Sequence, residues 1–357
     1  MLGGCATTPP ALDRPERVRT VSHVDKRIFP SDAALLDIVR DDYPGCSAAV
    51  GVRGEVVWAG ARGIANRRTK EPVTTSTRFD MASVAKQFTA TAILMLKREG
   101  ALKLSDPVSR YVSGLPAWGR QVTIEQLMHH TARVPDYWVE LDRHGIGFMD
   151  KANHRRILDA IRALPDLDPG TGYLYSNSNY VLLAEVVKKA SGMALPEFLD
   201  TRIFTPLGLD MELTPSLKAP DIALSYDDDL SYQPPGWTAY GAIGIYTTPS
   251  ELARWGDQYR ESPLGIIQAD FAEGAVPEGE GEKYGAGIDI EPDGDLNHNG
   301  RFGGYISAFT VSADRETTVV VMCNGHLSPR WELNDALWEI WVTGVPADEE
   351  PGAEAAP

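Results

Sequence analysis

Ser83 and Lys86, three positions apart in the segment FDMASVAKQFTA (residues 79–90), form the first pair whose types and spacing could do chemistry. On a helix this spacing puts a hydroxyl and an amine on one face, a turn apart. The neighbouring residues are mostly apolar, so we expect Lys86 to be buried, which lowers the pKa of a lysine. A neutral amine can then take the serine proton and make the oxygen a nucleophile. The alternative is a helix cap at Ser83 with a lysine that reaches solvent.

A second polar group, Tyr175, Ser176 and Asn177, precedes an apolar segment at 181–187. A tyrosine hydroxyl near a charged lysine can carry a proton to a leaving group. An asparagine amide both donates and accepts, so it can hold a lysine and a substrate together. The structural alternative is a polar loop that caps the following helix.

A third group, His298, Asn299, Gly300 and Arg301, enters a segment with the pattern of a strand. A glycine lets a substrate lie against a strand edge, and an N–H on that edge can stabilise an oxyanion. A single histidine before a strand would carry little information. The three groups gain weight only if one fold brings them together.

The elements that must position these groups follow from hydrophobic periodicity. Two short strands around a tight turn are expected at 48–52 and 55–60, and two more at 305–311 and 317–322. Helices are expected at 32–43, with Ser31 as N-cap, and at 331–341. Between the strands the chain is mostly helical, with expected helices at 83–99, 124–130, 154–164, 180–191, 195–203 and 250–259.

This order predicts an α+β fold, with one antiparallel sheet built from both chain ends, flanking helices and an inserted helical region. We expect a single catalytic unit over 26–343. Its sheet region covers about 26–80 and 280–343, and its helical region about 82–275. Residues 1–25 and 344–357 have the low hydrophobicity of disordered tails.

Composition narrows the function classes. The chain has 357 residues, of which 43% are hydrophobic and 24% charged, as in an ordinary globular protein. A formal net charge of -16 disfavours a nucleic-acid or anionic-membrane partner, because both require a basic surface. The apolar runs are shorter than the roughly 20 residues that span a bilayer.

The three cysteines are Cys5, Cys46 and Cys323. They are too few and too scattered for a disulfide framework or a zinc site, so Cys46 and Cys323 are interpreted as buried small hydrophobes. Cys5 stands in LGGCATTPP, which resembles the end of a bacterial lipoprotein signal and makes Cys5 a candidate for lipidation. This predicts an envelope location, with the membrane reached only through the lipid. A Gly-Cys tail without meaning is the alternative.

Taken together and in this order, the three groups resemble the serine beta-lactamase-related, penicillin-binding-protein-like superfamily. The similar branch contains class C beta-lactamases, D-aminopeptidases, D,D-carboxypeptidases and family VIII esterases. The resemblance extends from about residue 30 to 343 and is specific because many stretches match jointly. The supporting stretches are 45–52, 77–83, 127–131, 169–172, 241–248 and 284–287.

The resemblance implies a role for each group. Ser83 would be the acylated nucleophile, Lys86 its base, Tyr175 a proton carrier and Asn177 a substrate-positioning residue. The backbone N–H groups of Ser83 and Arg301 would form the oxyanion hole. The implied substrate is a small molecule or a peptide-like compound, and no metal or organic cofactor is expected. The adjacent histidines at 129–130 are interpreted as part of a structural turn.

Departures from the family pattern bear on the substrate. His298-Asn299-Gly300 stands where efficient beta-lactamases most often carry Lys-Thr-Gly. A histidine is only partly charged near neutral pH, so beta-lactam specialisation is disfavoured, although Arg301 could restore affinity for a carboxylate. Residues 130–133 read His-Thr-Ala-Arg instead of the usual His-Thr-Ser-Gly, which affects only the expected shape of the loop.

Three functions remain open on the sequence. A carboxylesterase for small acyl esters is slightly favoured over a peptidase for D-amino-acid or peptidoglycan-like amides. A catalytically idle sensor or scaffold is disfavoured, because it needs no lysine beside a serine. The acidic residues 227–229 could bind a substrate amine but are favoured as a solvated loop. Tyr137, Trp237 and Tyr240 could line the pocket or pack in the core.

Overall fold

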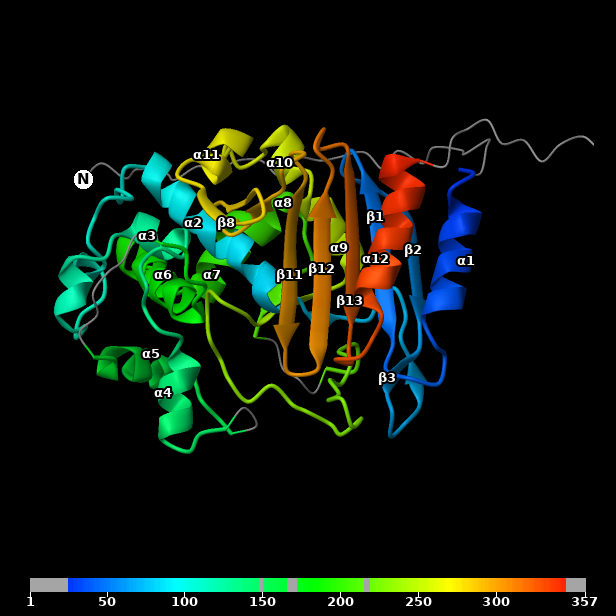
Figure 1. Cartoon of the computed structure of the whole chain (residues 1–357), viewed down its shortest axis with the longest axis horizontal. Coiled ribbons are helices and arrows are strands. Elements are labelled where there is room, and N and C mark those ends of the chain that lie inside the picture. The colour runs from blue at the N-terminus through cyan, green and yellow to red at the C-terminus, as the bar shows by residue number, and fades with distance from the viewer. Residues whose placement is uncertain (1–24, 148–149, 166–171, 215–218, 345–357) are drawn as a thin grey trace, which may run out of the picture.

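The computed structural model describes residues 25–147, 150–165, 172–214 and 219–344. Within these residues an eight-stranded antiparallel sheet has the order β2-β1-β13-β12-β11-β10-β9-β8 (Figure 1). Because β1 pairs with β13, the two ends of the chain meet in the middle of one sheet, as the sequence predicts. The strands are β1 Cys46–Val52, β2 Glu55–Arg62, β8 Val276–Gly279, β9 Glu282–Tyr284, β10 Asp289–Ile290, β11 Leu296–Phe302, β12 Tyr305–Val311 and β13 Thr317–Cys323.

Smaller elements complete the frame. Two short sheets are formed by β3 and β4 and by β5, β7 and β6. Their strands are β3 Ile64–Asn66, β4 Glu71–Pro72, β5 Phe79–Asp80, β6 Glu212–Leu213 and β7 Ile245–Thr247. The helices are α1 Ile28–Ile38, α2 Lys86–Arg98, α3 Ile124–Met128, α4 Tyr137–Arg143, α5 His154–Ala163, α6 Asn177–Ser191, α7 Leu195–Leu199, α8 Thr205–Leu207, α9 Pro249–Trp255, α10 Gln258–Glu261, α11 Gln268–Ala272 and α12 Arg330–Trp338.

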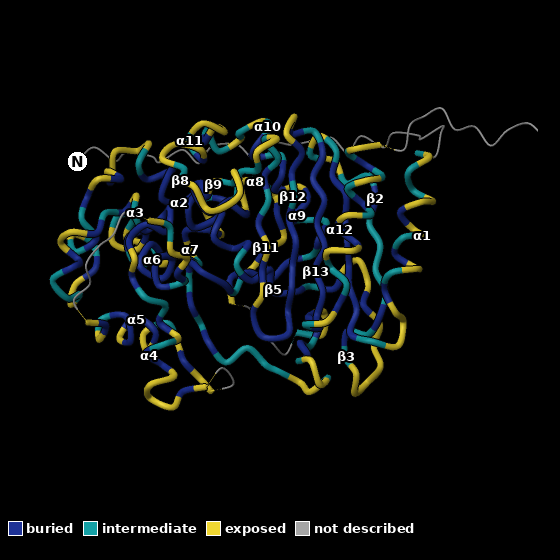
Figure 2. The backbone as a smooth tube through the Cα atoms, viewed as in Figure 1, coloured by how far each residue is buried: buried dark blue, intermediate teal, exposed yellow. Residues whose placement is uncertain are grey.

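The central strands are apolar on both faces because both faces are covered. Side chains alternate along a strand, so Val320 of β13 joins the core shared with the helical region. Val319 and Val321 join a second core, which lies under α1 and α12. Figure 2 shows β12 and β13 buried along their length. A strand that is covered on both faces has a continuous apolar sequence, which is the pattern at residues 319–323.

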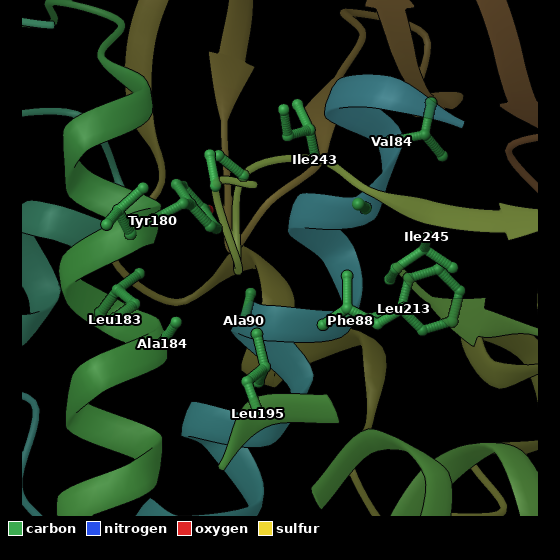
Figure 3. Packing of buried hydrophobic residues seen from close by; sticks show 14 of the residues in the cluster. Val84, Phe88, Ala90, Tyr180, Leu183, Ala184, Leu195, Leu213, Ile243 and Ile245 are labelled. Carbon is green, nitrogen blue, oxygen red and sulfur yellow. The ribbon is translucent and has the colours of Figure 1, made fainter. Parts of the chain in front are cut away.

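Helix α2 runs through the centre of the helical region beside α6 (Figure 1). Its residues from 86 to 96 are all buried. Figure 3 shows Ala90 of α2 on the side of Ala184 of α6, where small side chains let the helices approach. A helix that is apolar all round must be buried, and the prediction that Lys86 is buried with it is confirmed: Lys86 is 0% exposed.

Several helix boundaries differ from the sequence prediction. α1 begins at Ile28, ahead of the predicted start at 32, and Ser31 lies inside the helix rather than capping it. The Ser31 hydroxyl donates to the Arg27 carbonyl and accepts from the Trp341 indole N–H. It therefore links α1 to the segment that follows α12. The predicted segment at 250–259 is split into α9 and α10, and α6 begins at Asn177, ahead of the predicted start at 180.

The interpretation of Cys46 and Cys323 as separate buried thiols is wrong, because the two form a disulfide. Both are fully buried, as expected, but β1 and β13 pair in a register that places Cys46 opposite Cys323. Their Cα atoms are 4.1 Å apart although 277 positions separate them in the sequence. Cysteine spacing along the chain could not reveal this pairing, because it depends on the register of the sheet.

Some sequence predictions fall on residues outside the described ranges. These are the lipidation candidate Cys5, most of both predicted tails, and residues 169–171 of one supporting stretch. Among the described helices, none combines the length and the apolar character that crossing a bilayer would require.

Candidate active site

A buried turn presents Ser83 at the start of α2. The Met81 N–H donates to the Ile245 carbonyl at 2.9 Å, which fixes the turn to β7. The Asp80 carboxyl accepts from the backbone N–H groups of Ala82, at 2.8 Å, and Gly244, at 3.1 Å. Ala82 has a positive φ of 51°, a strained conformation for an alanine that these contacts hold in place. A single 3₁₀ turn, Ala82–Ala85, then leads into α2 and leaves Ser83 partly exposed.

The Lys86 amine lies at the centre of the site. Its Nζ is 3.1 Å from the Ser83 hydroxyl, 2.8 Å from Asn177 Oδ1 and 3.1 Å from the Ala242 carbonyl. Burial lowers the pKa of Lys86 to about 7, with Asp136 and Asp289 acting in the opposite direction. A substantial share of the amine is therefore neutral at physiological pH.

The partners of Lys86 determine what a neutral amine can do. It has two N–H bonds to donate and one lone pair that accepts. The Ala242 carbonyl and Asn177 Oδ1 can only accept, so they use both N–H bonds. The lone pair then has the Ser83 hydroxyl as its partner, which can donate its proton. This arrangement can activate Ser83 as a nucleophile.

Tyr175 reaches the same serine from the segment before α6. Its hydroxyl hydrogen-bonds with Ser83, and its ring centroid is 4.9 Å from Lys86 Nζ. Burial around the hydroxyl raises the pKa of Tyr175, so it stays protonated, while 37% of the side chain remains exposed. A protonated hydroxyl beside the nucleophile, on a partly open side chain, can pass a proton to a leaving group.

His130 holds Tyr175 in place, a role that its interpretation as a structural turn missed. Its backbone φ is +55°, so it does form a turn. Its ring also lies 4.3 Å from that of Tyr175 and 4.8 Å from that of Tyr284. Nδ1 accepts the backbone N–H of Ser176 at 3.2 Å, which ties this turn to the Tyr175 segment. Burial keeps the pKa of His130 well below its usual range, so the ring is neutral.

β11 passes directly beside the turn that carries Ser83. A Cβ atom on Gly300 would lie 2.5 Å from the Met81 carbonyl oxygen, so only glycine allows this approach. Strand β10 pairs only with Leu296 and Asn297, so in the described chain no strand covers that edge of β11 from 298 onward. The open edge and the Ser83 turn are thus neighbours, as an oxyanion hole shared between them would require.

His298 does not present a charge to the site. It is 3% exposed, its Nδ1 donates to the Asn299 carbonyl at 2.7 Å, and its Nε2 lies 3.3 Å from the Tyr284 hydroxyl. Burial, together with the positive charge of Lys86, lowers the pKa of His298 to about 3. The expectation of a partly charged histidine is therefore corrected: this ring is neutral. Side chains alternate between the two faces of β11, and Asn299 and Arg301, which lie on the face opposite His298, are exposed.

Three carboxyl groups close to the site were not singled out from the sequence. Asp136 accepts two hydrogen bonds from Asn177, each 2.8 Å long. Asp289 lies opposite Tyr284 in the sheet, and Glu278 accepts from the Tyr173 hydroxyl at 2.6 Å. Burial and the neighbouring Glu278 raise the pKa of Asp289 to about 9. Asp136 could have been found as an acidic cap before the apolar pattern at 137–141, whereas Asp289 has no local signal.

Comparison with known proteins agrees with this geometry. Residues 24–339 match the beta-lactamase family model. The chain belongs to the beta-lactamase family. It is 28% identical to a D-aminopeptidase of Gluconobacter oxydans over 86% of this chain and 61% of that protein. It is 27% identical to a D-aminopeptidase of Brucella anthropi over 79% of this chain and 56% of that protein. The chain thus spans about three fifths of the length of these relatives.

Solved structures show the same architecture. A penicillin-binding protein homologue from Pyrococcus abyssi superposes with a TM-score of 0.73 at 26% identity, covering 83% of this chain and 73% of that one. A D-amino acid amidase from Ochrobactrum anthropi SV3 superposes with a TM-score of 0.71 at 21% identity, covering 86% of this chain and 97% of the amidase, and supports the fold alone. The family match and these relatives place the chain in the beta-lactamase and penicillin-binding-protein superfamily.

The remaining candidates lie away from Lys86. Asp227 and Asp228 face His326 at 3.3 and 3.5 Å, and an Arg301 guanidinium nitrogen is 3.4 Å from the same ring. The three residues Asp227, Asp228 and His326 bring ligand atoms within 4.8 Å of one another, the one such group in the described part of the chain. The adjacent guanidinium would compete with a metal ion there. The aromatic candidates are used in packing: Tyr137 and Trp237 contact each other, and Tyr240 stacks on His154.

Proposed function

We propose that this protein hydrolyses small amides or esters of D-amino acids that carry a free amino group, through an acyl-enzyme on Ser83. The observation that carries the hydrolytic step is the set of partners of Lys86, which leaves the lone pair of the amine for the Ser83 proton. A scaffold or sensor gains nothing from a lysine buried at 0% exposure beside a partly exposed serine. This supports an enzyme over the idle alternative.

Each step of the proposed reaction has a group in place. Lys86 takes the Ser83 proton as the Ser83 oxygen attacks the carbonyl carbon, and the backbone N–H groups of Ser83 and Arg301 stabilise the oxyanion. The tetrahedral intermediate collapses and the bond to the leaving group breaks; Tyr175 gives the leaving group a proton and is reprotonated from Lys86. Water then gives a proton to Lys86 as it attacks the acyl-enzyme, the bond between the acyl carbon and the Ser83 oxygen breaks, the Ser83 oxygen takes that proton, and the carboxylic acid departs. Asn177 holds Lys86 and the substrate amide.

The charges around the site support the substrate class. Neutral His298 offers no cation to a substrate carboxylate, which disfavours beta-lactams and D,D-carboxypeptidase substrates. Asp289 and Glu278 lie close enough to the catalytic groups to act on them electrostatically, since Asp289 influences Lys86 and both carboxyl groups influence Tyr175. Because Asp289 is largely protonated near neutral pH, the attraction for a cationic amine comes from the Glu278 carboxylate, and the D-aminopeptidase relatives are consistent with such a substrate.

Ester hydrolysis without an amine requirement, which the sequence slightly favours, is the second candidate. The observation in its favour is the same neutral His298, since a site without a fixed cation also accepts uncharged acyl groups. The carboxyl pair Asp289 and Glu278 separates the two candidates, because an uncharged ester gains nothing from it.

The test uses purified wild type and Ser83→Ala with four substrates. These are D-alanine p-nitroanilide, its N-acetyl derivative, p-nitrophenyl butyrate and a chromogenic cephalosporin. We expect turnover of the free-amine anilide that disappears in Ser83→Ala and falls at least about tenfold on N-acetylation. Faster turnover of the butyrate, with no effect of N-acetylation, would favour the esterase. Equal rates in wild type and Ser83→Ala would remove the acyl-enzyme proposal.

We also propose that the protein works in the bacterial cell envelope, tethered through lipidated Cys5. The disulfide between Cys46 and Cys323 supports this location, because such bonds persist in oxidising compartments and are rare in the cytosol. Mass spectrometry of the protein isolated from its own bacterial cells would show a diacylglycerol adduct on Cys5. An unmodified Cys5 in a soluble fraction would contradict the tether.

A further inference from the structure

One carboxylate, that of Asp136, connects the starts of two helices. Its Oδ2 accepts from both the backbone N–H and the side-chain amide of Asn177, at 2.8 Å each, where α6 begins. Its Oδ1 accepts from the Trp138 N–H at 3.5 Å, as the N-cap of α4. Burial raises the pKa of Asp136, and the hydrogen bonds from Asn177 and Trp138 at the two helix N-termini oppose that rise by stabilising the carboxylate. Asp136 therefore fixes the position of Asn177 from a segment 41 residues away in sequence.

The same contact decides which way the Asn177 amide points. A carboxylate only accepts hydrogen bonds, so the amide NH₂ of Asn177 must face Asp136. The amide oxygen then faces Lys86 Nζ at 2.8 Å. In the opposite orientation the amide NH₂ would face the Lys86 N–H bonds, and the carbonyl of Asn177 would face the carboxylate. Both contacts would be repulsive, so Asp136 excludes this orientation.

We propose that Asp136 is a positioning residue that orients the Asn177 amide and thereby directs the lone pair of the Lys86 amine at the Ser83 hydroxyl. It touches neither the reacting atoms nor the substrate. With the amide oxygen in place, Asn177 and the Ala242 carbonyl use both N–H bonds of the neutral amine. Without it, the amine can rotate and donate to Ser83 instead of accepting from it. The role rests on the proposed acyl-enzyme reaction at Ser83.

The surroundings of Lys86 make its protonation sensitive to Asp136. The two histidines near the amine are neutral, because burial lowers the pKa of each. The tyrosines are neutral as well, because burial raises their pKa values. The pKa of Asp289 is raised to about 9, so it is largely protonated near neutral pH. Several titratable groups face Lys86. They are Asp136, which caps α4, His130 after α3, Tyr175 before α6, Tyr180 in α6, Asp289 in β10 and His298 in β11.

The test compares Asp136→Asn and Asp136→Ala with Asn153→Ala as a matched control. Asn153 caps the neighbouring helix α5 through the Arg156 N–H at 2.9 Å, so its loss reproduces the removal of a cap alone. We expect kcat of Asp136→Ala to fall about 10- to 100-fold, with KM changed less than about threefold. In Asp136→Asn the acidic limb of kcat/KM should shift to lower pH by about half a unit or more, because the loss of the anion lowers the pKa of Lys86.

The control defines the result that would overturn the proposal. If both Asp136 variants lose no more kcat than Asn153→Ala and keep the wild-type pH limb, Asp136 is only a helix cap. If Asp136→Ala does not fold, the nearly isosteric Asp136→Asn and its pH limb decide. A wild type without Ser83-dependent turnover would instead remove the proposed function. NMR titration of the Lys86 amine would then test Asp136 directly, since an unchanged titration in Asp136→Asn contradicts its influence on Lys86.

Discussion

The strand β13 and the surroundings of the Ser83 turn are both largely buried, but the groups that they bury differ. All seven residues of β13 are buried, and its apolar side chains feed two hydrophobic cores. Around the turn the enclosed groups are polar: Asp80, Lys86 and His130 are 1%, 0% and 0% exposed. Burial of apolar area stabilises the fold, whereas burial of ionisable groups costs stability unless they are paired. The difference indicates that the turn is maintained for reactivity rather than for stability.

Replacing Lys86 by methionine should give the largest effect on activity with the smallest effect on stability. Methionine keeps the volume but removes the base, so kcat/KM should fall by about a thousandfold or more. The free energy of unfolding should change by less than about 1 kcal/mol, because relief of desolvation offsets the hydrogen bonds lost by Asn177 and Ala242. Steady-state kinetics and chemical denaturation measure both. A large loss of stability with retained activity would show that Lys86 serves the fold and not the reaction.

Replacing Val321 by alanine should have the converse effect. Val321 lies on β13, and its side chain is fully buried in the core under α1 and α12. Loss of two methyl groups should lower the free energy of unfolding by about 2 kcal/mol, roughly a thirtyfold change in the unfolding equilibrium. We expect kcat/KM in the folded enzyme to stay within about twofold of wild type. A comparable loss of activity would show that the sheet centre and the site are coupled.

The pH dependence sharpens the role of the turn. Lys86 must be neutral to accept the Ser83 proton, and burial puts its pKa at about 7. We expect kcat/KM to be level above that pH and to fall about tenfold for each unit below it. If the charged form of Lys86 were the active one, kcat/KM would instead fall as the pH rises. Rates with an uncharged ester separate this limb from ionisation of the substrate.

Glu278→Gln tests the carboxyl groups beside the site, because the neighbouring Asp289 is largely protonated near neutral pH and carries little charge. The substitution should raise KM for a free-amine substrate about tenfold and leave an uncharged ester unaffected. Asp227→Asn is the matched control, since Asp227 belongs to the acidic cluster beside His326. We expect it to leave both substrates within about twofold. If the control raises the KM of the amine and Glu278→Gln does not, the amine binds at residues 227–229 instead.

The sequence was most informative for single strands and helices, whose hydrophobic pattern lies within the element itself. The strand patterns at 317–322 and at 48–60 predicted the main sheet, and the apolar surroundings of Lys86 predicted its burial. Both signals are local, because hydrophobic periodicity depends on neighbouring residues alone. The order of the three polar groups, together with the resemblance, indicated the fold and the hydrolase class.

Features that depend on long-range pairing could not be predicted in this way. The disulfide needs the register of β1 against β13, and Asp136 meets Asn177 only after α4 and α6 are packed. Asp289 acquires its environment from β8, β9 and the Glu278 side chain. The neutral state of His298 likewise follows from its burial and from the nearby Lys86, which no spacing in the sequence reports.

The disulfide makes the protein topologically a ring with two tails. Cys46 and Cys323 lie on either side of every proposed catalytic residue, so the chain between them forms a covalently closed loop. One cut by a protease anywhere in that loop would leave both pieces joined. On a denaturing gel the nicked protein should therefore run as one species without reductant and as two fragments with it. A nick in the helical insertion could then leave the two catalytic halves physically linked, and an assay of the gel-purified nicked form would show whether they still act together.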